Sequence, residues 1–76
     1  MKKISVLIAG RHMTSITLED EFYDVLKQIC KEKKTSISDI VTEIDGMRKT
    51  KNLSSAVRIY ILQELKAQSN FSKTTL

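Results

Sequence analysis

The 76-residue sequence has one cysteine, one histidine and no proline. A lone cysteine, Cys30, excludes an internal disulfide framework, and Cys30 together with His12 supplies too few ligands for a four-ligand zinc site. We therefore expect no metal and no cofactor. Cys30 falls at the spacing of buried residues in its segment, which favours a core thiol in a reducing, cytoplasmic setting.

Long apolar runs are also missing. The N-terminal run at residues 4–9 contains Ser5 and is shorter than the roughly 7 to 15 apolar residues of a signal-peptide core. No other stretch approaches the roughly 18 apolar residues that a membrane-spanning helix needs. The sequence therefore predicts a soluble, cytoplasmic protein with no membrane partner.

No arrangement of residues suited to catalysis is present. The sequence has no glycine-rich phosphate-binding loop and no cysteine and histidine at a useful spacing. The acidic cluster Glu19, Asp20 and Glu21 is better explained by helix initiation than by acid and base chemistry. We therefore do not expect an enzyme.

Positive charge gathers at the N-terminal end. The net charge is +4, and the first 18 residues contain Lys2, Lys3 and Arg11 but no acidic residue. Such a field attracts polyanions, including nucleic acids. An excess of four charges also occurs in proteins that bind no nucleic acid, so charge alone does not decide between these classes.

Residues 13–18 are predicted to form a short strand. Alternation places Met13, Ser15 and Thr17 on one exposed face, while the even-numbered residues face the helices. A lone strand leaves its backbone groups unpaired, and its simplest partner is the same strand of a second copy. Small domains also commonly need oligomerisation for stability. The sequence therefore predicts a homodimer.

Apolar residues at 3.6-residue spacing predict two helices after the strand. The first begins near Asp20 and ends within residues 31–34. The second opens at Ser36, whose hydroxyl and the carboxylate of Asp39 form a capping box. Its apolar stripe stops at Asp45 and Gly46. The predicted buried faces are Phe22, Val25, Leu26, Ile29 and Cys30 in the first helix, and Ile37, Ile40, Val41, Ile44 and Met47 in the second.

A third helix follows a polar connector, with Asn52 or Ser54 as its cap. Ile59 and Leu62 broaden its apolar face, which indicates a subunit interface. The composition then turns polar, and residues 69–76 are predicted to be a flexible tail in which Phe71 is loose. The predicted buried face of this helix is Leu53, Ala56, Val57, Tyr60, Ile61 and Leu65.

Residues 1–12 allow two interpretations, an N-terminal arm around a partner or an extra strand beside residues 13–18. Two copies of an extra strand would give the dimer four strands, spanning roughly 15 Å between outer backbones, whereas a major groove is roughly 12 Å wide. Groove insertion would then require the outer strands to move away. The chain is accordingly divided into residues 1–12, a domain at residues 13–68 and the tail.

This order of strand, helix, short loop and hydroxyl-capped helix, over roughly residues 11–47, resembles the ribbon-helix-helix DNA-binding family, to which the Arc and MetJ repressors belong. Residues 14–19 with Phe22, the pair at 44–45, and residues 52–58 are similar to a bacterial subfamily with an extra C-terminal helix. The resemblance implies a mainly α fold with a short β-ribbon. Its expected form is an intertwined ribbon-helix-helix homodimer with an additional C-terminal helix, or a tetramer of such dimers.

The resemblance also implies double-stranded DNA as partner and a role in transcription regulation. Met13, Ser15 and Thr17 would then face the bases of the major groove from a two-stranded ribbon. Family members commonly carry Arg or Lys where this chain has Met13, and a methionine cannot donate hydrogen bonds to guanine. The predicted phosphate contacts are Arg11, Lys33, Lys34, Ser36, Ile37 and Ser38.

The alternative function is a structural or protein-interaction dimerisation module of the same fold that does not bind DNA. It would use the third helix and the N-terminal strand for assembly. The two interpretations differ in what they predict for the face around Ser15. An uncovered, electropositive face two strands wide favours DNA, whereas a broad sheet or a covered neutral face favours assembly.

Overall fold

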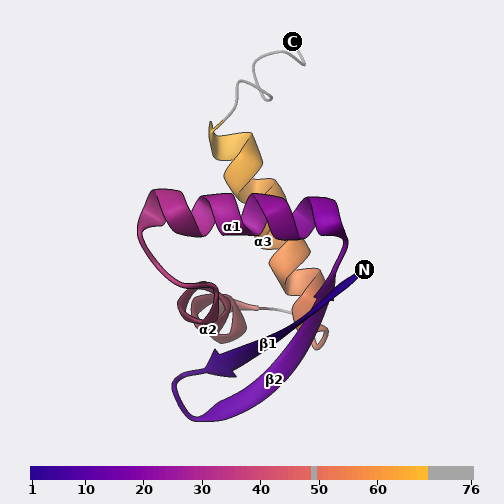
Figure 1. Cartoon of the computed structure of the whole chain (residues 1–76), viewed down its shortest axis with the longest axis vertical. Coiled ribbons are helices and arrows are strands. Elements are labelled where there is room, and N and C mark those ends of the chain that lie inside the picture. Colours follow the sequence, from indigo (N-terminus) through magenta and orange to yellow (C-terminus); the bar gives the residue numbers. More distant parts are fainter. Residues whose placement is uncertain (49, 69–76) are drawn as a thin grey trace.

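A computed structural model describes residues 1–48 and 50–68. These residues form an antiparallel hairpin followed by three helices, which lie on one side of the hairpin (Figure 1). Helix α2 packs mainly against β1, and α3 packs against β2. The predicted tail at 69–76 lies outside the described residues. The elements are β1 (Lys2–Ile8), β2 (His12–Leu18), α1 (Asp20–Lys33), α2 (Ile37–Met47) and α3 (Leu53–Gln68).

Strand β2 has its partner in the same chain. Residues 1–12 were expected to form either an arm or an extra strand, and the structure shows the extra strand. This strand, β1, pairs with β2 so that Ser5 lies opposite Ser15. The connecting turn is closed by the Arg11 N–H, which donates to the Ile8 carbonyl at 2.9 Å. A second copy is therefore not required to pair this edge of β2, contrary to the sequence-based argument for a homodimer.

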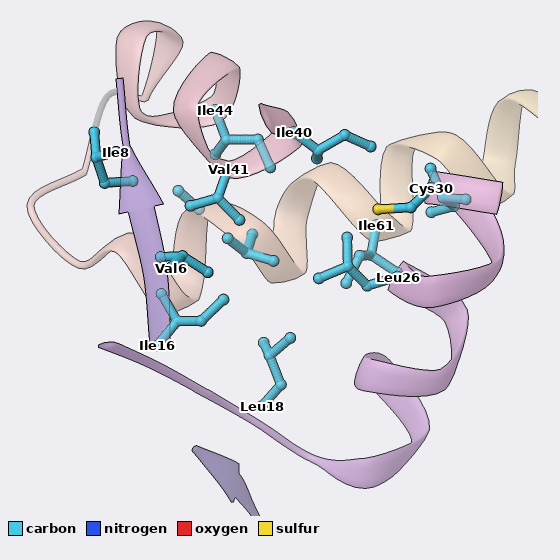
Figure 2. Close-up of a cluster of buried hydrophobic side chains, with 13 residues drawn as sticks. Val6, Ile8, Ile16, Leu18, Leu26, Cys30, Ile40, Val41, Ile44 and Ile61 are labelled. Carbon is cyan, nitrogen blue, oxygen red and sulfur yellow. The ribbon is translucent and has the colours of Figure 1, made fainter. Parts of the chain in front are cut away.

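The hydrophobic core lies between the hairpin and the helices (Figure 2). Alternation sends Val6 and Ile8 of β1 and Ile16 and Leu18 of β2 into it, as predicted for residues 13–18. Each fully buried large aliphatic side chain contributes roughly 1.5–3 kcal/mol through removal from water. The helices contribute Leu26, Ile29, Cys30, Ile40, Val41, Ile44, Ala56, Val57 and Ile61.

Cys30 belongs to this core, as its spacing predicted. Burial raises the pKa of its thiol. A protonated thiol is neither a good nucleophile nor a metal ligand. Cys30 therefore acts as a small apolar residue.

The helix boundaries follow the local sequence closely. Helix α1 begins at Asp20 and ends where Lys34 adopts a left-handed conformation with φ 55°. The Ser36 hydroxyl caps α2 by accepting from the Asp39 N–H at 3.1 Å. The Asn52 side chain caps α3 by accepting from the Ser55 N–H at 3.2 Å, which decides between the two predicted caps.

Two residues predicted to be buried are exposed. Met47 is 64% exposed because it lies in the last turn of α2, at the rim of a cleft rather than under α3. Leu65 is 40% exposed and belongs to the C-terminal part of α3, the end of the helix that extends past α1 (Figure 1). The apolar spacing predicted the helix face correctly but not where the neighbouring elements stop covering it.

Candidate nucleic-acid interface

The outer face of the hairpin is uncovered and two strands wide. Met13, Ser15 and Thr17 are exposed on β2, and Met13 retains 63% of its surface. Neighbouring strands lie about 5 Å apart, so this face is narrower than a major groove of roughly 12 Å. The residues directly opposite these three on β1 are Leu7, Ser5 and Lys3, which are also exposed.

The two strands of this face carry positive charge and no acidic residue. Lys3 lies on the strand face and Arg11 lies at the hairpin tip, and both are exposed. Residues 1–18 include no aspartate or glutamate. None of the ion pairs among residues 1–48 and 50–68 involves Lys3 or Arg11. Both cations are therefore available to an external anion.

The N-terminus of α2 lies beside the hairpin. The Ser38 hydroxyl accepts from the Leu7 N–H at 3.1 Å, which joins α2 to the outer edge of β1. Ser36 uses its hydroxyl to cap the helix, and Ile37 is half-buried against the core. All three predicted phosphate contacts thus have structural roles, while the positive end of the helix dipole faces this region. Phosphate binding here stays a prediction.

The two lysines before α2 differ in their surroundings. Lys33 Nζ lies 3.4 Å from Glu64 Oε1, which links α1 to α3. The hydrogen bond to Glu64 raises the pKa of Lys33. Lys34 is exposed at the end of α1, where its N–H closes the helix on the Lys31 carbonyl. Lys33 is therefore already neutralised by a carboxylate, and Lys34 is the more available of the two.

Two of the three segments behind the family resemblance meet in space. The Thr17 N–H donates to the Ser54 hydroxyl at 3.0 Å, and Arg58 Nη2 donates to the Thr17 carbonyl at 3.1 Å. Arg58 Nε also lies 2.8 Å from Glu19 Oε1, and its guanidinium lies 6.0 Å from the centroid of the Phe22 ring. These residues join β2 and α1 to α3. Sequence reasoning missed this joint, although the spacing of Ser54 and Arg58 places both on one side of a helix.

The joint also defines the outer edge of β2. Since the Thr17 N–H and carbonyl point away from β1, strand periodicity directs those of Met13 and Ser15 the same way. Ser54 and Arg58 close this edge at Thr17. The outer edge of β2 is consequently open at Met13 and Ser15 but closed at Thr17.

An apolar cleft of about 370 Å³ lies between the end of α2 and α3. Its walls include Ile44, Ala56 and Tyr60, with Met47 and Ile59 at its exposed rim. Leu62 and Leu65 continue the apolar surface along α3, and Ile59 and Leu62 are 52% and 55% exposed. We call Met47, Ile59, Leu62 and Leu65 the α3 flank.

The family follows from comparison with known proteins. The family model described as ribbon-helix-helix domain matches residues 1–65. The chain therefore belongs to the ribbon-helix-helix domain family, and the hairpin followed by helices agrees with this assignment. Neither the curated proteins nor the solved structures compared with the chain gave a match. Within residues 1–48 and 50–68, no helix is long and apolar enough to cross a membrane.

Proposed function

We propose that this protein is a homodimeric, non-enzymatic, DNA-binding transcription regulator of the cytoplasm. The observation that supports DNA binding most directly is the outer face of the hairpin, which is uncovered, two strands wide and free of acidic residues. These are the properties that distinguish a groove-binding ribbon from an assembly surface. Membership of the ribbon-helix-helix family supports the same function.

On this proposal the hairpin enters the major groove with its outer face toward the bases. The hydroxyls of Ser15 and Thr17 donate to or accept from base edges, and Met13 contacts a thymine methyl group. Arg11, Lys34 and the first amides of α2 meet the phosphates on either side, which sets the register of the hairpin on the duplex. Lys33 contacts a phosphate only if its ion pair with Glu64 breaks.

The second copy associates through the α3 flank on this proposal. Four exposed apolar side chains beside an apolar cleft form a surface that a monomer leaves in water. The alternative is the outer edge of β2, which points away from β1 and is held by α3 at Thr17. Association through α3 leaves both hairpins free to contact two half-sites.

Salt-dependent binding to duplex DNA tests this function. We expect labelled duplexes from a broad sequence pool to bind, with the association constant falling steeply as salt rises. Ser15→Ala and Thr17→Ala should each weaken binding while the urea midpoint and the dimer are retained. Absence of salt-sensitive binding by the folded wild-type protein would refute the proposal. Loss of folding in either variant would assign that residue a structural role.

The second candidate is a protein-interaction module of the same fold. The α3 flank favours it, because these apolar residues need a partner whether or not DNA is bound. Under this alternative the wild-type protein self-associates but shows no affinity for duplex DNA. Measuring both properties on one preparation separates the two candidates.

A further inference from the structure

Two lysines from different elements lie beside one aromatic ring. The Nζ atom of Lys2, in β1, is 5.4 Å from the centroid of the Tyr23 ring in α1, and the Nζ atom of Lys27 is 5.0 Å from the same centroid. The two nitrogens are therefore no farther apart than these distances added together, about 10 Å. An aromatic ring attracts a cation electrostatically, so Tyr23 holds both ammonium groups in one place.

Both ammonium groups lack a carboxylate partner. Lys2 and Lys27 are exposed, and no ion pair between described residues involves either of them, although Asp24 lies one turn before Lys27 in α1. Tyr23 is half-buried and packs against the hydrophobic core, which fixes the position of its ring. Two like charges at this separation repel each other, and a bound anion removes that repulsion. The cluster of Lys2, Tyr23 and Lys27 is consequently suited to hold an anionic group.

The cluster continues as a line of cations along α1. Tyr23, Lys27 and Lys34 are spaced i, i+4 and i+11, which places all three on one face of a helix with 3.6 residues per turn. Lys34 is exposed about 10 Å beyond Lys27 along the helix axis, at the end of α1. The line therefore leads to the N-terminus of α2, where the helix dipole is positive.

We propose that Lys2 and Lys27 bind the phosphate backbone of duplex DNA, with Tyr23 as the residue that positions them. This rests on the proposed DNA binding and adds two contacts to the one assigned to Lys34. Each DNA strand carries one negative charge about every 3.4 Å, so a line of cations engages successive phosphates. A free phosphate ion or a single carboxylate meets only one point of that line. Backbone contacts of this kind set the register of the protein on the duplex without reading its sequence.

Lysine substitutions test the proposal. Lys2→Gln and Lys27→Gln each remove one charge from the cluster, whereas Lys66→Gln removes an exposed charge near the C-terminal end of α3 and is the matched control. The probe is a labelled duplex of mixed sequence, titrated by fluorescence anisotropy over a range of salt concentrations. Each cluster variant should weaken binding about three- to tenfold at low salt and reduce the salt slope by about 1 per copy bound. Lys66→Gln should change affinity by less than about twofold.

Two substitutions of Tyr23 test its positioning role. Tyr23→Phe retains the aromatic ring and should bind DNA within about twofold of wild type. Tyr23→Leu keeps both lysines but removes the ring that holds them, and should weaken binding about threefold. Urea unfolding of both variants checks that the fold is retained under the binding conditions. Equal DNA binding by the two folded variants would contradict the positioning role.

The outcomes separate this proposal from the proposed function. If the wild-type protein does not bind duplex DNA, the proposed function fails. If it binds, but Lys2→Gln and Lys27→Gln weaken binding no more than Lys66→Gln does, the proposal for the cluster alone is overturned.

Inorganic phosphate distinguishes the two sources of the bound anion. It is titrated against the wild-type protein in place of the duplex and followed through the NMR signal of the Lys27 amide. Inorganic phosphate should bind at least about 100-fold more weakly than the duplex, because only a polymer engages the whole line of cations. Comparable affinities would assign the cluster to a free anion and overturn the backbone contact.

Discussion

Arg58 of α3 binds Glu19 at the start of α1, with Nε 2.8 Å from Oε1. The same guanidinium donates to the Thr17 carbonyl, so one side chain ties together the end of β2, the beginning of α1 and α3. The hydrogen bond from Arg58 lowers the pKa of Glu19 below its ordinary value of 4.5. This pair therefore makes folding depend on pH.

The pH dependence can be isolated with Glu19→Gln. Because the pKa of Glu19 is lower in the folded state than in the unfolded state, the ionised carboxylate stabilises the fold above the unfolded pKa. That contribution is lost as pH falls through the lower folded pKa. We expect wild type to exceed Glu19→Gln in urea midpoint at about pH 7 and the difference to shrink toward about pH 3. Glu21→Gln, in the exposed first turn of α1, is the control. A difference that is the same at both pH values would contradict the role of ionised Glu19.

Ser54→Ala tests the contact between β2 and α3. It removes the hydroxyl that accepts the Thr17 N–H and should cost about 1 kcal/mol of unfolding free energy. Hydrogen exchange at the Thr17 amide should become faster in the variant, because its acceptor has been lost. Ser55→Ala is a neighbouring control, since Ser55 contributes its backbone N–H rather than its hydroxyl to the helix cap. Unaltered Thr17 exchange would show that this hydrogen bond contributes nothing in solution.

Local patterns predicted most of the fold because they are set by neighbours in sequence. The start of α1 at Asp20 and the Ser36 cap of α2 depend on residues within one helical turn, and both predictions are confirmed. The alternation in residues 13–18 predicted the buried Ile16 and the exposed Ser15 for the same reason. What these patterns could not specify is which segment pairs with β2.

Contacts between distant segments account for what sequence reasoning missed. Arg58 and Glu19 are 39 residues apart, and no periodicity links them. Lys3 shares a face with Thr17 only through the hairpin register, which depends on the length of the turn. Lys33 was predicted to contact phosphate, but its pairing with Glu64 required knowing how α1 crosses α3. The sequence thus predicted the part of the candidate interface that lies on β2, but not the part that lies on β1.

Substitution of Ser36 by Asp separates helix capping from phosphate contact. Aspartate caps helices about as well as serine, so Ser36→Asp should change the unfolding free energy by less than about 0.5 kcal/mol, whereas Ser36→Ala should cost about 1 kcal/mol. If α2 points its first amides at a phosphate, the added negative charge should weaken DNA binding severalfold. Gln28→Glu adds the same charge on α1 and should have a smaller effect. Equal effects of Ser36→Asp and Gln28→Glu on affinity would remove the α2 N-terminus from the interface.

The hairpin turn places an alanine, Ala9, in a left-handed backbone conformation that is costly for this residue. Ala9 and Gly10 both have positive φ, at 53° and 65°, and turns of this kind favour asparagine before glycine. The alanine Cβ makes the left-handed region costly, whereas asparagine tolerates it. Ala9→Asn should therefore raise the unfolding free energy by about 0.5–1 kcal/mol. Gly10→Ala should lower it by about 1 kcal/mol through backbone strain alone, because an added Cβ at Gly10 meets no atom within 4 Å. Reversal of either sign would indicate a different turn in solution.

The proposed dimer predicts that the α3 flank, rather than the edge of β2, joins two copies. Leu62→Glu places a charge in the α3 flank and should shift the protein to monomer in sedimentation equilibrium without lowering the stability of the fold, since Leu62 is 55% exposed. Ala67→Glu, farther along α3, should retain the dimer.

A cysteine at position 15 tests the competing edge directly. An antiparallel ladder between two β2 strands centred on Ser15 would place the two Ser15 side chains opposite each other, close enough for a disulfide, and would require Thr17 to leave Ser54 and Arg58. With the dimer on the α3 flank, Ser15→Cys should oxidise to a covalent dimer no faster than Ser5→Cys, which lies across the same hairpin face. Rapid crosslinking of Ser15→Cys alone, together with a Leu62→Glu variant that remains dimeric, would place the interface on β2 and require the joint at Thr17 to open.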